Sequence, residues 1–155
     1  MRSIELISIV ESSLSDVWTA WTTEEGLNGF FAEKNRVELA IGGAYELEVH
    51  SWSPELIRSR PTGVLAYVPE RMLAFEWNQF PQGLSLDGGS TWVVVEFKEM
   101  DDELCEVSLT HLGWNEGADW ETCYQYFLSF WPKVLQRFER YMCVGEIDWS
   151  TISRS

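Results

Sequence analysis

Apolar and polar positions repeat with a helical period over residues 119–143. At about 100° per residue, the apolar positions fall within about a quarter of the helical circumference. They are Trp120, Tyr124, Phe127, Trp131, Leu135, Phe138 and Met142. Pro132 lies on the opposite, polar side, where it removes an amide donor and crowds the carbonyl of Leu128, which predicts a kink. The pattern predicts a long amphipathic helix whose aromatic face needs a large apolar surface to lie on.

The segments before this helix alternate with a period of two, which is typical of antiparallel strands with one buried face. A first strand is predicted over residues 4–10, and six more over 35–41, 44–51, 63–68, 71–78, 91–98 and 104–112. Between the first two strands we expect a short helix over 16–21, capped by Ser13 or Ser15, and a second one capped by Thr23. Gly42 and Gly43 indicate a hairpin turn, and residues 79–89 a long loop.

Composition restricts the possible functions. The length of 155 residues suits a single domain, assigned to 1–144 with a tail at 145–155. Eleven basic against twenty-five acidic side chains give a net charge of −14, which opposes binding to nucleic acid or anionic membranes. The apolar run near the start is too short for a signal peptide or a membrane span. We therefore expect a cytoplasmic protein, either monomer or homodimer.

Metal and cofactor chemistry have no support in the sequence. Cys105, Cys123 and Cys143 are far apart, no CxxC occurs, and no Cys/His cluster has metal-ligand spacing. The sequence also lacks the GxSxG, HExxH, P-loop and GxGxxG motifs. We expect no metal, no cofactor and free thiols.

Several local motifs, taken in order, resemble one known family. They include residues 17–22, the Gly42-Gly43-Ala44-Tyr45 turn, and Thr110-His111 followed by Gly113-Trp114. The chain resembles the bacterial family named after activators of heat-shock chaperone ATPase, within the START-like group of polyketide cyclases and lipid-transfer proteins. The resemblance implies an α+β helix-grip fold: a curved antiparallel sheet of about six or seven strands wrapped on one long C-terminal helix, with two short helices after the first strand.

The same resemblance implies a cavity between sheet and helix, and strand alternation with the helical stripe indicates which side chains would line it. The candidate ligand-binding residues are Trp77, His111, Trp114, Trp120, Tyr124, Phe127 and Trp131. An alternative interpretation is that these rings simply fill the core, since dense packing is the norm in proteins.

His111 is the most informative polar residue, because it shares an inner strand face with Cys105, Val107 and Leu109. It could be a core histidine paired within the protein, a hydrogen-bond partner of Tyr124 or of a ligand, or a general base. His50, which alternates with apolar residues, is expected at the surface.

Three functional hypotheses follow. The first is non-enzymatic binding of a small apolar or aromatic molecule. The second is a protein-interaction domain that acts on a chaperone ATPase. The third is a cyclase- or hydrolase-type enzyme with His111 as its base. No inward strand position offers an acidic partner for His111, which favours binding over catalysis.

The charge leads to a direct prediction. The protein should bind neither DNA nor RNA at physiological salt, because it lacks a basic stripe and carries a charge of −14. A filter-binding assay checks this, and retention at micromolar protein would show that the charge argument is wrong.

Overall fold

The computed structural model describes residues 2–48, 62–81, 83–84, 86 and 90–145. The elements follow in this order: β1 (Ile4–Val10), α1 (Leu14–Thr22), α2 (Glu24–Phe30), β2 (Lys34–Val37), β3 (Tyr45–Glu48), β4 (Val64–Val68), β5 (Met72–Trp77), β6 (Thr91–Asp101), β7 (Leu104–Leu112) and α4 (Ala118–Val144). The predicted α+β class and the order of strands and helices are confirmed.

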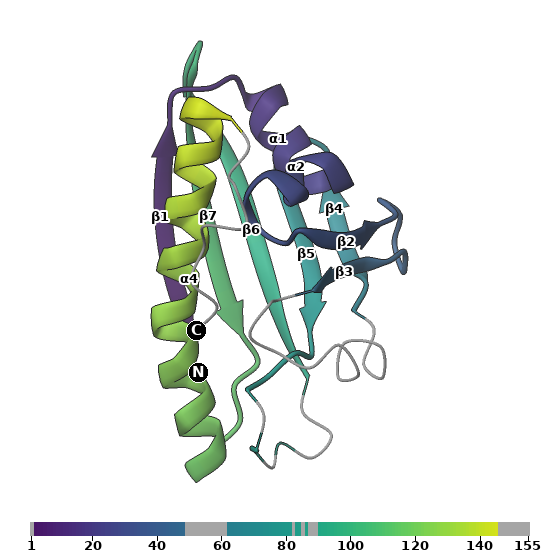
Figure 1. Ribbon diagram of the computed structural model, residues 1–155, viewed down its shortest axis with the longest axis vertical. Helices are drawn as coiled ribbons and strands as arrows, with labels where there is room; N and C mark the ends of the chain where they lie inside the picture. Colours follow the sequence, from purple (N-terminus) through teal and green to yellow (C-terminus); the bar gives the residue numbers. More distant parts are fainter. Residues whose placement is uncertain (1, 49–61, 82, 85, 87–89, 146–155) are drawn as a thin grey trace.

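Five strands form an antiparallel sheet in the order β1-β7-β6-β5-β4. The hairpin of β2 and β3 continues it beyond β4 through a bridge between Ala44 and Gly63 and backbone bonds such as Val64 N–H to Gly43 O, 2.8 Å. In Figure 1, α4 runs along the sheet, and α1 and α2 lie near the C-terminal end of α4. This arrangement confirms the helix-grip fold.

The two short helices begin at side-chain caps. Ser13 Oγ accepts a hydrogen bond from the amide of Asp16, so Ser13 rather than Ser15 caps α1. Thr23 Oγ caps α2 by accepting from the amide of Gly26, as predicted. A Cβ at Gly29 would overlap the ring of Tyr141, so glycine leaves room for this α4 side chain against α2.

The long helix matches its predicted range to within one residue at each end. All residues of its apolar stripe are buried or half-buried, whereas the flanking Leu128 is 40% exposed. The helix runs through Pro132 and stops before Gly145, whose positive φ of 95° suits glycine and whose amide bonds Tyr141 O at 2.9 Å. The kink at Pro132 stays a prediction.

One predicted strand was too long. Pairing of β2 ends at Val37, and Ile41, expected on an inner face, is 76% exposed. The chain turns earlier because the amide of Ala40 bonds Glu38 O and the amide of Gly43 bonds Ala40 O, both at 2.8 Å. These local bonds take the place of the inter-strand hydrogen bonds that the alternation predicted. His50, the end of the 44–51 strand and the tail from residue 146 lie outside the described residues.

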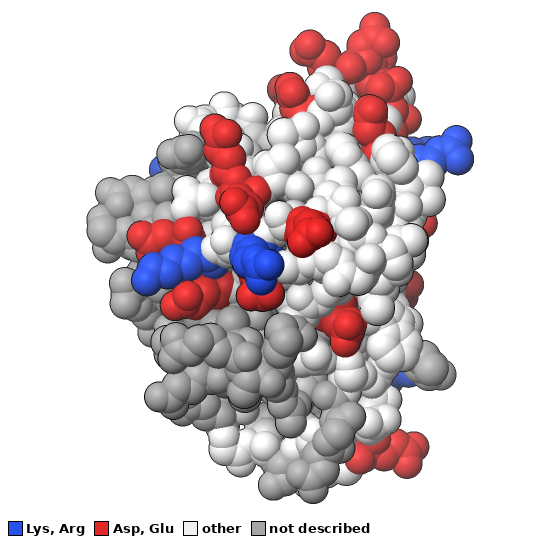
Figure 2. Space-filling model, turned by 90° about the vertical axis from the view of Figure 1, so that its right-hand side faces the viewer, with Lys and Arg blue, Asp and Glu red and all other residues white. Residues whose placement is uncertain are grey.

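Acidic side chains outnumber basic ones among the described residues of the visible surface. On the face shown in Figure 2 they gather at the upper end, where the tip of the β6–β7 hairpin lies, and basic groups sit among acidic ones. Arg36, for example, pairs with Glu46 at 3.5 Å. Among the described residues on this face, no basic stripe is offered to a polyanion.

Candidate functional site

The candidate site lies at the end of the sheet where β5 and β7 finish and where β6 and α4 begin (Figure 1). Trp77 is the last residue of β5 and pairs with Thr91, the first residue of β6. His111 pairs with Val93 of β6 near the end of β7. Trp77 is 1% exposed and His111 is 0% exposed, so strand alternation predicted both inner-face positions correctly.

All seven sequence-predicted residues belong to one network of ring contacts, here called the aromatic cluster. Trp77 lies 5.1 Å from Trp131 and 5.9 Å from Phe127, between ring centroids. The network then continues from His111 to Trp114 at 4.4 Å, and from Trp114 to Tyr124 at 5.4 Å and Trp120 at 6.3 Å. Most of these pairs meet edge to face, the geometry that aromatic quadrupoles favour.

Burial decreases across the aromatic cluster. Trp77, His111, Phe127 and Trp131 are fully enclosed, and Trp120 is 7% exposed, whereas Trp114 and Tyr124 are half-buried. Phe130, which the helical stripe did not include, is also half-buried and lies 5.8 Å from Trp77. The cluster therefore extends from the core to the surface on one side of α4.

The hydrogen bonds of His111 fix its tautomer. An indole N–H can only donate, so the contact of 2.9 Å from Trp131 Nε1 makes Nδ1 of His111 an acceptor. The neutral ring then carries its proton on Nε2 and donates to Thr91 Oγ at 2.7 Å. Thr91 in turn donates to the carbonyl of Trp77 at 2.7 Å. Both ring nitrogens thus have partners within the protein.

Burial lowers the pKa of His111 from 6.5 to about 3. The imidazole is therefore neutral at physiological pH, with Nδ1 already occupied by Trp131 and Nε2 protonated. A general base needs a free lone pair and a pKa near the working pH. This geometry fits the interpretation of His111 as a core histidine paired within the protein.

The series of bonds continues beyond His111 to the hairpin. Trp77 Nε1 donates to the carbonyl of Gln79 at 2.7 Å, and Gln79 Nε2 donates to the carbonyl of Leu47 in β3, also at 2.7 Å. The buried hydrogen-bond series, as we call it, comprises Trp131, His111, Thr91, Trp77, Gln79 and Leu47. It connects α4, β7, β6, β5 and β3.

Sequence reasoning overlooked Thr91 and Gln79, although the signal was present. Thr91 stands two residues before the inward Val93, and Gln79 stands two residues after Trp77. The same alternation that placed the apolar neighbours therefore places both polar side chains inward, and each is at most 1% exposed.

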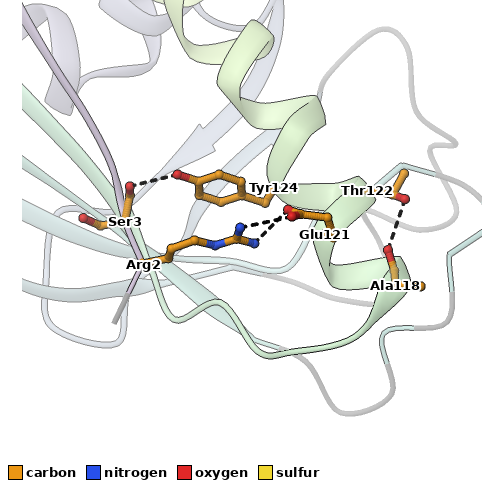
Figure 3. A network of polar contacts seen from close by, with 6 residues as sticks. All are labelled: Arg2, Ser3, Ala118, Glu121, Thr122 and Tyr124. Carbon is orange, nitrogen blue, oxygen red and sulfur yellow. Dashed lines mark hydrogen bonds and ion pairs between the residues drawn. The ribbon is translucent and has the colours of Figure 1, made fainter.

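Tyr124 does not pair with His111. Its hydroxyl donates to the backbone carbonyl of Ser3 at 3.3 Å, and the guanidinium of Arg2 lies 3.9 Å from its ring centroid (Figure 3). Arg2 also forms two bonds to the carboxylate of Glu121, of 2.9 and 3.2 Å. The Tyr124 hydroxyl thus bonds the backbone at Ser3, and the hydrogen-bond partners of His111 are Trp131 and Thr91 instead.

The described part of the chain contains neither a metal-binding cluster nor a membrane-spanning helix. There, no group of three or more His, Cys, Asp or Glu side chains could hold a metal ion. Among the described helices, none has the length and apolar character needed to cross a bilayer. Burial raises the pKa of the Cys123 thiol to about 12, which leaves it protonated and unreactive at neutral pH.

A comparison with protein families matches residues 11–142 to the family described as Activator of Hsp90 ATPase homolog 1-like protein. The chain belongs to this family. A search of curated proteins found no match. The family assignment confirms the resemblance seen in the local motifs, and the match covers α1, α2, the strands from β2 to β7 and nearly all of α4.

Solved structures share the fold of this Hsp90 ATPase activator-like chain at low sequence identity. Protein MLL2253 from Mesorhizobium loti is 16% identical with a TM-score of 0.76, over 94% of this chain and 100% of that one. The Aha1 dimer from Colwellia psychrerythraea is 16% identical with a TM-score of 0.71, over 94% and 98%. DynU16, a putative protein in the dynemicin biosynthetic locus, is 15% identical with a TM-score of 0.70, over 93% and 48%. At these identities the likeness establishes the fold alone.

The low pKa of His111 makes stability depend on pH. The unfolded chain takes up a proton on this residue below about pH 6.5, while the folded chain does so only near pH 3, so stability falls as the pH drops through that window. Between pH 7 and pH 4.5, wild type should lose about 2 to 3 kcal/mol more than His111→Gln. Urea unfolding at both pH values measures this. An equal loss in both proteins would show that the folded imidazole titrates normally.

Proposed function

We propose that the protein binds a small apolar or aromatic molecule in a cavity between the sheet and α4, without catalysing a reaction. The observation that supports this most is the course of the aromatic cluster from the fully buried Trp77 and Trp131 to the half-buried Trp114 and Tyr124. The rings form a continuous set that reaches the surface. A planar ligand that enters along them would make edge-to-face contacts with each ring in turn.

The polar part of the cluster favours binding over catalysis. His111 has no free lone pair, and its pKa lies near 3. In the described contacts of the imidazole no carboxylate takes part. An enzyme of cyclase or hydrolase type would need a proton acceptor that this arrangement does not offer.

The description of the family supports a second candidate, a domain that acts on a chaperone ATPase. Such a domain needs a docking surface, and Ile7 on the edge strand β1 is 65% exposed. Along its row of the sheet, however, Ser108 and the exposed Glu96 separate it from the apolar side chains of β5 and β4. A broad apolar patch, which would favour this candidate, does not run across this row.

Binding is tested with the neutral fluorescent probe N-phenyl-1-naphthylamine and with native mass spectrometry of freshly purified protein. We expect saturable binding of the probe, or a retained small molecule. Trp114→Ala removes a half-buried ring of the aromatic cluster and should weaken probe binding about 5- to 30-fold, which corresponds to about 1 to 2 kcal/mol.

Trp18→Ala provides the matched control. Trp18 is also a half-buried tryptophan, but it belongs to α1 and packs against Phe97 of β6, away from the cluster. Its loss should leave the affinity within about twofold. The absence of saturable binding, or an equal effect of both substitutions, would argue against a site in the aromatic cluster.

A further inference from the structure

One atom of the buried hydrogen-bond series has no partner within the described residues. Gln79 is 1% exposed, and its Nε2 donates to Leu47 O, but its Oε1 accepts no hydrogen bond. The amide cannot simply be turned over, because that would place Oε1 against the carbonyl oxygen of Leu47. The orphan is therefore an acceptor, and a buried acceptor without a donor is costly to the fold.

Two other buried polar atoms in the described part of the chain lack a partner, and each has a local explanation. The indole N–H of Trp21 is packed among aromatic rings, with the Phe30 centroid at 5.0 Å, and ring faces accept weakly from N–H groups. The other atom, Oδ1 of Asn35, belongs to a half-buried side chain in β2. Only for Gln79, among these three, does deep burial coincide with a position beside the candidate site.

Gln79 lies in the wall of the aromatic cluster. Its carbonyl accepts from the indole of Trp77, and the next residue, Phe80, is 5% exposed and lies 5.7 Å from Trp120. Trp77 and Trp120 are both members of the cluster, so Gln79 bonds one of its rings and the neighbouring Phe80 packs against another. Its Oε1 is thus an unpartnered acceptor on a residue that is joined to one ring of the cluster and adjoins a contact of another.

The charges beside the cluster indicate a neutral ligand. Among the described contacts, the cation that touches a cluster ring is Arg2 over Tyr124, and it is already paired with Glu121. Among the described residues, a carboxylate or phosphate buried here would find no unpaired cation in these contacts, and its desolvation would be costly. The acidic surface of the protein would also repel it.

Building on the proposed function, we propose that the ligand is a neutral aromatic molecule with a hydroxyl group, and that this hydroxyl donates a hydrogen bond to Oε1 of Gln79. Ring contacts with the cluster supply most of the affinity. Gln79 selects molecules that carry a donor over those of the same shape that carry only an acceptor.

The test compares 2-naphthol with 2-methoxynaphthalene, which keeps the rings and the oxygen but lacks the donor. Affinities of both probes are measured by calorimetry for wild type and for Gln79→Met, which has similar length and no acceptor amide. The preference for 2-naphthol should be about tenfold larger in wild type than in the variant. Because each preference is a ratio within one protein, loss of the bond to Leu47 affects both probes alike.

The outcomes separate the two proposals. Binding of both probes with equal preference in both proteins overturns the role of Gln79 and leaves the proposed function standing. Failure of both probes to bind wild type overturns both proposals for this class of ligand. If Gln79→Met does not fold, NMR of wild type decides: the side-chain amide of Gln79 should shift more with 2-naphthol than with 2-methoxynaphthalene, and equal shifts overturn the inference.

Discussion

The hydrogen bond from the indole of Trp131 to Nδ1 of His111 is the contact on which the site depends. It joins the middle of α4 to the last strand of the sheet through two side chains that are both fully buried. Because the indole can only donate, the bond also sets the imidazole tautomer and so directs Nε2 to Thr91 and onward to the carbonyl of Trp77. A single donor on the helix thereby orders polar groups on three strands.

The apolar and polar parts of the site reinforce each other. The rings of the aromatic cluster exclude water from His111, and this burial keeps the imidazole neutral. The neutral imidazole in turn holds Trp131 and Thr91 in place, and these contacts fix the positions of the rings. As a result, both ring nitrogens of His111 are bonded within the protein, and the imidazole has no free lone pair for catalysis. Gln79, near the other end of the series, has one acceptor without a partner. This arrangement fits the proposed binding of an aromatic molecule better than acid–base chemistry at His111.

Alternation and helical periodicity were sufficient for most of the fold. They identified β1, both short helices, the inner faces of β5 and β7 and the long α4, because each of these elements buries one regular face. They failed at residues 38–41, where local backbone bonds compete with the ladder, a choice that side-chain pattern does not reveal. In the site, the ring positions followed from periodicity, but the partner of His111 did not. Tyr124 was an expected partner, yet the choice between Tyr124, Thr91 and Trp131 depends on three-dimensional distances across strands and helix.

The protonation state of His111 tests this account most directly. NMR of protein labelled with ¹⁵N-histidine distinguishes a protonated ring nitrogen from a bare one by chemical shift. We expect one histidine, absent from the spectrum of His111→Gln, to show a protonated Nε2 and a bare Nδ1, unchanged from pH 8 down to about pH 5. A resonance from His111 that titrates near pH 6.5, or that shows the proton on Nδ1, would contradict the hydrogen bonds on which the site is built.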